Sequence, residues 1–167
     1  MRGGLLPIEK KRLLEVMQTR QNIALVPGGV SEMLHCIPHS ETIKVSIKHK
    51  GFVRLALQHG YDLVPTFLFH TNDQYDNPMG KLQHLSYRWT GVPLGIPFYT
   101  NRWWLPVSNR TTIRIALGKR IPVTKNANPT LDDVDALHRL FYKEVLRVWQ
   151  KHKDGFGYGN RKLAYVT

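Results

Sequence analysis

The feature that most constrains this chain is an apolar run that stops at a proline and two glycines. Residues 23–26 read Ile-Ala-Leu-Val, and Pro27, Gly28 and Gly29 follow directly. An apolar run bounded in this way is typical of a short buried strand. Adjacent glycines permit positive φ and a close approach of the backbone to a ligand. The pattern predicts a strand ending in a glycine loop whose N–H groups can hold a phosphate or an oxyanion, or else a tight turn between core elements.

Polar side chains that could perform chemistry follow the loop closely. Glu32 comes three residues after Gly29 and could orient a histidine, accept a hydroxyl proton, or simply stabilise the turn. His39 is a candidate general base, and an ordinary surface role is its alternative. His35 and His39 have the i, i+4 spacing of a zinc pair, but Pro38 opposes a helix there and no third ligand is evident. The sequence therefore predicts no metal site.

Size and charge limit the class of protein. The 167 residues are 42% hydrophobic, which predicts a single globular domain over residues 1–167. The net charge of +12 favours anionic partners such as nucleic acid, acidic lipid headgroups or a phosphorylated cofactor. Cys36 is the only cysteine, so no internal disulfide forms. The longest uncharged run, residues 89–101, is too short and too rich in proline to span a bilayer.

Periodicity along the chain predicts an α/β fold: a mostly parallel sheet flanked by helices, with a long amphipathic helix near the C-terminus. Residues 71–109 are expected to form a long irregular insertion rich in tryptophan. The strand 43–48, the helix 52–59 and the strand 62–69 are expected to form a crossover unit. The other predicted elements are helices at 8–20 and 130–152 and strands at 111–117 and 121–123.

The last helix carries the clearest pattern. Thr130 is its expected N-cap, and acidic residues fill its first turns. Basic residues gather at its C-terminal end, either as a solvated face that suits the helix dipole or as a contact with an anionic membrane. The predicted buried stripe is Val134, Leu137, Leu140, Phe141, Val145, Leu146, Val148 and Trp149.

A second candidate binding feature lies at the start of the helix 52–59. Lys48, Lys50 and Arg54 surround Gly51 at the expected helix N-terminus. Basic side chains beside free helical N–H groups make a natural phosphate-binding corner. The alternative is that these charges are simply solvated, as most lysines and arginines are.

Taken in order, these segments resemble the diacylglycerol/monoacylglycerol acyltransferase family over about residues 20–153. The Gly28–Glu32 segment is similar to the family's Gly-Gly-x-x-Glu box. Four further segments resemble family motifs: His49–Leu57, Asp62–Phe67, Asn72–Tyr75 and Gly118–Val123. The long helix at 130–152 corresponds to the family's last helix.

The chain also departs from the family pattern. The family's His-Pro-His-Gly box, which the resemblance implies carries the catalytic histidine, does not occur in this sequence, and neither does the family's membrane hairpin. His70 and Thr71 stand where the family usually has Gly-Glu, and His49 replaces an arginine. The resemblance therefore implies the C-terminal portion of a glycerolipid acyltransferase domain, inactive by itself.

The resemblance implies transfer of a fatty acyl group from acyl-CoA to the hydroxyl of a mono- or diacylglycerol-like acceptor. Acyl-CoA is then a co-substrate and no further cofactor is expected. Glu32 would support a histidine base, Gly28 and Gly29 would shape the site, and Lys50, Gly51 and Arg54 would bind substrate.

The expected location is the cytosolic face of the endoplasmic reticulum membrane, with the membrane surface as a partner. The alternative hypothesis is a non-catalytic, basic peripheral membrane module. A nucleic-acid-binding domain rests on charge alone, without a recognition motif, so no nucleic acid partner is expected.

Overall fold

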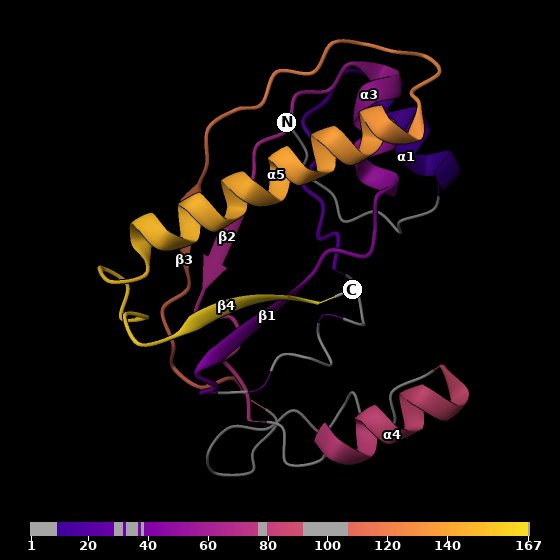
Figure 1. Ribbon diagram of the computed structural model, residues 1–167. Coiled ribbons are helices and arrows are strands. Elements are labelled where there is room, and N and C mark those ends of the chain that lie inside the picture. Colours follow the sequence, from indigo (N-terminus) through magenta and orange to yellow (C-terminus); the bar gives the residue numbers. More distant parts are fainter. Residues whose placement is uncertain are drawn as a thin grey trace.

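The computed structural model describes residues 10–28, 32, 37, 39–76, 80–91 and 107–166. Helices and strands are mixed along this part of the chain, so the predicted α/β class is confirmed (Figure 1). In order, the elements are α1 (Lys10–Gln18), β1 (Thr42–Ser46), α3 (Gly51–His59), β2 (Thr66–Phe69), α4 (Gly80–Thr90), β3 (Arg114–Leu117), α5 (Leu131–His152) and β4 (Lys162–Val166).

The described strands form two pairs. β1 and β4 are parallel, with Thr42 opposite Lys162 and Ser46 opposite Val166. β2 and β3 are antiparallel, and an isolated bridge between Leu63 and Ile121 extends them. β1 and β2 therefore belong to different pairs, which differs from the crossover unit that the sequence predicts. Among the described strands, β1 pairs with β4, a strand with no clear alternation in sequence, and β2 pairs with β3.

The core lies where α5 crosses β2 and β3 (Figure 1). Phe67, Phe69 and Ala116 point from the strands toward Val148 and Trp149 of the helix. The rings of Phe69 and Trp149 stack with centroids 5.4 Å apart, and Tyr158 meets both edge-on. These aromatic side chains bury large apolar areas, so this cluster contributes much of the stability that fixes α5 on the sheet.

The long C-terminal helix is confirmed, together with its cap. The Thr130 side chain accepts a hydrogen bond from the N–H of Asp133, and the Asp133 carboxylate accepts one from the N–H of Thr130. This reciprocal capping box satisfies two N–H groups at the helix start. The buried residues are Val134, His138, Tyr142, Val145, Val148 and Trp149.

The predicted stripe of α5 is wrong at one position, because Leu140 is exposed. The stripe also omitted His138 and Tyr142, which are buried. Both are polar aromatic residues, so hydropathy undervalues them, yet they lie four residues apart on the buried face. Tyr142 is accommodated there because its hydroxyl donates to the carbonyl of Ser46 at 3.0 Å.

Two further predictions are wrong. Residues 23–26 do not form a strand, and Leu25 and Val26 are exposed. An apolar run becomes a strand only when another strand pairs with it, and no described segment pairs with this one. The segment 71–109 is not wholly irregular, because it contains α4; Trp89 lies exposed on that helix, whereas Trp103 and Trp104 lie outside the described residues.

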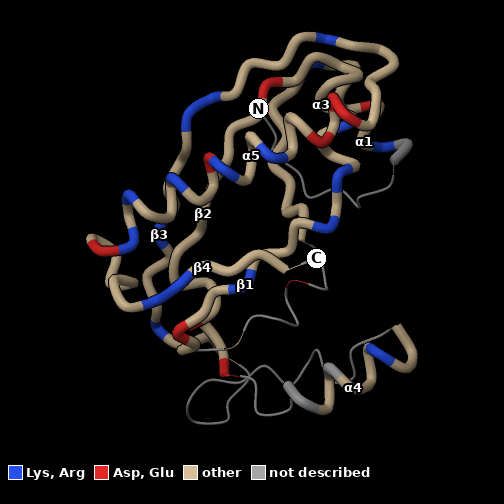
Figure 2. Tube along the Cα trace, in the orientation of Figure 1, with Lys and Arg blue, Asp and Glu red and all other residues tan. Residues whose placement is uncertain are grey.

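No helix in the described part of the chain is both long enough and apolar enough to cross a bilayer. Lysines and arginines are spread along the chain, from the region of α1 to the end of α5 and β4 (Figure 2).

Candidate functional site

Gly28 lies in a turn and makes room for the side chain of Glu32. The N–H of Glu32 donates to the carbonyl of Gly28 at 3.3 Å. A Cβ placed on Gly28 would lie 1.7 Å from Oε2 and 2.6 Å from Cβ of Glu32. Any larger residue at this position therefore forces the Glu32 side chain to move. Gly29 lies outside the described residues.

Glu32 ties this turn to the carboxyl end of β1. Its Oε2 accepts a hydrogen bond from the N–H of Ser46, the last residue of the strand, at 3.2 Å. Burial and, to a lesser degree, the charge of Glu32 raise the pKa of Tyr142 to about 12, so this hydroxyl stays protonated. In parallel α/β sheets, ligands bind beyond the carboxyl ends of the strands. The turn and its carboxylate therefore occupy the expected place for a site.

The phosphate-binding corner is only partly open. Gly51 begins α3, with Lys50 as its N-cap and no side-chain cap hydrogen bond. The space beside Gly51 is open, and Arg54 is exposed. The ammonium of Lys50, however, lies 2.7 Å from a carboxylate oxygen of Asp135 on α5. This lysine thus joins two helices, and its charge is available to an anion only when that ion pair opens.

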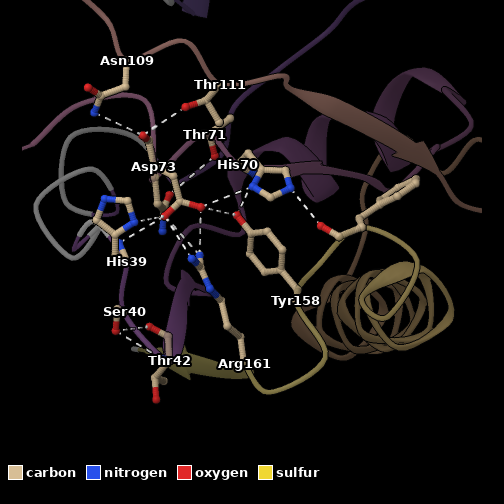
Figure 3. A network of polar contacts seen from close by, with 12 residues as sticks. His39, Ser40, Thr42, His70, Thr71, Asp73, Asn109, Thr111, Tyr158 and Arg161 are labelled. Carbon is tan, nitrogen blue, oxygen red and sulfur yellow. Dashed lines mark hydrogen bonds and ion pairs between the residues drawn. The ribbon is translucent and has the colours of Figure 1, made fainter. Parts of the chain in front are cut away.

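His39 lies among carboxylates rather than in a free loop (Figure 3). Its backbone N–H donates a hydrogen bond to Oδ1 of Asp73 at 3.1 Å. Its ring nitrogens lie 3.6 Å from Asp73 and 3.7 Å from Asp76, and 67% of its side chain is exposed. His39 therefore lies before the amino end of β1, whereas Glu32 is bonded to Ser46 at its carboxyl end, so the structure does not bring these two predicted site residues together.

The structure shows a polar cluster around Asp73 that the sequence analysis did not predict (Figure 3). Arg161 reaches both carboxylate oxygens of Asp73, at 3.0–3.2 Å. The hydroxyl of Tyr158 donates to Oδ2 at 3.2 Å, and Nδ1 of His70 lies 3.3 Å from the same oxygen. The Asp73 side chain is only 8% exposed. Burial alone would raise the pKa of Asp73, but these hydrogen bonds hold it below its ordinary value.

His70 is fixed at both ends of its ring. Its Nε2 lies 2.8 Å from the carbonyl of Phe156, and its backbone N–H donates to the hydroxyl of Tyr158 at 2.6 Å. The backbone of His70 has a φ of 67°, in the left-handed region that favours glycine. Contacts with Asp73, Phe156 and Tyr158 therefore hold a strained conformation in place.

This cluster has a structural role: it holds parts of the chain in position. Both oxygens of Asp73 accept hydrogen bonds from charged or polar groups, which leaves the carboxylate a poor general base. Asn72–Tyr75 did stand out in sequence, but the partners of Asp73 lie as many as 88 residues away. Only the folded chain brings Tyr158 and Arg161 to this turn.

A groove of about 460 Å³ lies elsewhere on the molecule, between α3, residues 122–126 and the first half of α5. Most of its lining is apolar, including Leu57, Val123 and Leu140. No described residue predicted for the site lines this groove. In the part of the chain that the structure describes, no three His, Cys, Asp or Glu side chains are arranged to hold a metal ion.

Comparison with known proteins identifies relatives along nearly the whole chain. A family model described as diacylglycerol acyltransferase matches residues 1–164. The chain is 29% identical to a diacylglycerol O-acyltransferase 2 from Xenopus tropicalis, over 100% of this chain and 50% of the relative. It is 33% identical to a mouse acyl-CoA wax alcohol acyltransferase 1, over 86% of this chain and 47% of the relative.

A mouse 2-acylglycerol O-acyltransferase 1 is 30% identical, over 94% of this chain and 50% of that protein. The chain thus spans about half the length of the curated relatives it matches. No solved structure is significantly similar to it.

Proposed function

This chain belongs to the diacylglycerol acyltransferase family, and on that premise we propose that it supplies part of a site for acyl transfer. The reaction moves a fatty acyl group from acyl-CoA to the hydroxyl of a mono- or diacylglycerol-like acceptor. One observation carries the proposal: the Gly-Gly-x-x-Glu box ends with Glu32 hydrogen-bonded to the N–H of Ser46 at the carboxyl end of β1. The carboxyl ends of parallel strands are where α/β proteins bind their ligands.

The reaction needs a base, an oxyanion site and a leaving group. A histidine removes the proton from the acceptor hydroxyl, and the resulting alkoxide attacks the thioester carbonyl. Backbone N–H groups stabilise the negative oxygen of the tetrahedral intermediate, which then expels the CoA thiolate. Glu32 acts as a positioning residue that holds the glycine turn against β1. The expected base is a histidine supplied with a His-Pro-His-Gly box. His39 is the alternative within these 167 residues, although it lies at the opposite end of β1 from Glu32.

The remaining contacts with substrate are assigned from the charge and the exposure of the side chains. Arg54 and the open N-terminus of α3 would receive phosphates of CoA, joined by Lys50 once its ion pair with Asp135 opens. Trp89 is exposed on α4, where an aromatic ring of this kind can contact an acyl chain or the surface of a bilayer. We place the reaction at the cytosolic face of the endoplasmic reticulum membrane, following the resemblance.

The experiment compares this chain with a chimera. Purified chain is incubated with labelled acyl-CoA and diacylglycerol, monoacylglycerol or a long-chain alcohol, and we expect no turnover. The chimera joins it to the part of the Xenopus tropicalis relative that it does not match, and we expect turnover. Glu32→Ala removes the acceptor of the Ser46 N–H and should lower the rate of the chimera about 100-fold, because misplacing a reacting group by an ångström costs that much.

Lys143→Gln, an exposed substitution on α5, is the matched control and should leave the rate of the chimera unchanged. A chimera that is active and indifferent to Glu32→Ala would contradict the proposed role of this turn. Turnover by the chain alone that His39→Ala abolishes would instead assign the base to His39.

A further inference from the structure

The antiparallel pair β2–β3 has one buried face and one open face. Phe67, Phe69 and Ala116 point toward α5, which covers that side (Figure 1). Alternation sends the neighbouring side chains to the other side, where Leu68 stands opposite Ile115 and Thr66 opposite Leu117. The apolar residues of this outer face are exposed: Val64 47%, Leu68 44%, Ile113 39%, Ile115 63% and Leu117 68%.

A contiguous apolar face of this kind indicates a missing contact. Isolated exposed leucines are ordinary, but a row of aliphatic side chains across two strands is typical of an interface. An antiparallel pair can leave one face in water, but that face is then ordinarily polar, whereas this one is apolar. A sheet that is apolar on a second face buries it against another layer, which in α/β folds is a layer of helices. In the described part of the chain, α5 covers only the inner face of this pair.

The relatives suggest where the missing layer comes from. They match nearly all of this chain, but the chain spans only 47–50% of their length. The unmatched half of these relatives is long enough to supply a further layer. We propose that the outer face of β2–β3 receives an amphipathic helix from the part of the family domain that this chain does not match.

A lipid surface is a poorer occupant for a physical reason. Among the described residues, β2 and β3 pair with each other and with no other strand. Pressing such a pair into hydrocarbon would bury the unpaired N–H and C=O groups along its edges. A helix covers the apolar face and leaves those edges to water or to further strands.

The test is association in trans. The unmatched part of the Xenopus tropicalis relative is produced as a separate polypeptide in detergent and used to capture this chain. The test variant carries Ile115→Glu and Leu117→Glu. The matched control carries Leu131→Glu and Leu140→Glu, two exposed leucines on α5 that receive the same charge. We expect the test variant to lose more than about tenfold in affinity and the control to bind as the unsubstituted chain does.

A second measurement needs no variant. Hydrogen exchange of the unsubstituted chain should slow over residues 64–68 and 113–117 when the partner is added. Equal binding by both variants, or a complex that leaves this exchange unchanged, would overturn the proposal. So would dimerisation of the chain alone, or binding to phosphatidylcholine vesicles alone, if the test variant removed it and the control did not. All these readouts are of binding, so they are independent of the acyl-transfer proposal.

Discussion

At the scale of single residues, the contacts of Gly28 explain why a glycine stands at the first position of the Gly-Gly-x-x-Glu box. All three atoms nearest to a Cβ built on Gly28 belong to Glu32, the closest at 1.7 Å. The glycine is thus needed less for an unusual φ than for the space that the carboxylate fills. That carboxylate in turn holds the N–H of Ser46, so the two residues act together.

This pairing predicts a measurable coupling. Gly28→Ala should destabilise the chain by about 2 kcal/mol, because the new methyl group must displace the Glu32 side chain. In a Glu32→Gly background the same substitution should cost close to nothing. Urea unfolding of the two single variants and the double variant measures the coupling. If the losses of unfolding free energy in the two single variants add up to the loss in the double variant, Gly28 is required for some other reason.

At the scale of helices and strands, Asp73 joins separate elements of the fold. It lies in the turn after β2, while Tyr158 and Arg161 lie between α5 and β4 (Figure 3). Burial and, less strongly, the charge of Asp73 raise the pKa of Tyr158 to about 12, so its hydroxyl remains a donor. The cluster therefore fastens the segment that leads into β4, and with it the parallel pair β1–β4.

Removing this carboxylate should loosen the C-terminal segment. Because Asp73→Asn leaves Arg161 without its buried partner, we expect a loss of about 3 kcal/mol at pH 7. The folded chain holds the pKa of Asp73 below its ordinary value of 3.8, so its stabilisation is complete above that pH and is lost as the pH falls toward the lowered pKa. Unfolding by urea at pH 7 and pH 3 measures both effects.

The unsubstituted chain should lose more stability between these two pH values than the Asp73→Asn variant does. Asp154→Asn, at an exposed carboxylate just after α5, is the control and should change little at either pH. An Asp73→Asn variant as stable as this control at pH 7 would contradict the role given to the cluster.

At the scale of the whole molecule, features that depend on neighbouring residues could be predicted from the sequence, whereas contacts between distant residues could not. The cap at Thr130 could be predicted because a few neighbouring residues determine it. The pairing of β1 with β4 could not, since it joins residues 120 apart, such as Thr42 and Lys162. The Asp73 cluster likewise depends on contacts between residues as many as 88 apart.

The family was identified from the order of several motifs along the chain. That order holds even where the prediction for a single element is wrong. The strand expected at residues 23–26 is such a case, because the structure leaves this run unpaired and exposed. Of the predicted site residues, Lys50 and Arg54 lie at the start of α3, and Glu32 contacts the carboxyl end of β1.

The central claim is that acyl-CoA binds at the carboxyl end of β1, and photolabelling tests it most directly. The active chimera is irradiated with a photoreactive acyl-CoA, and labelled peptides are mapped by mass spectrometry. We predict labels on residues 28–32 and 46–54, which excess unlabelled acyl-CoA suppresses and Lys143→Gln leaves in place. Labels confined to the groove between residues 122–126 and α5, with none on the Gly28–Glu32 turn, would contradict the claim.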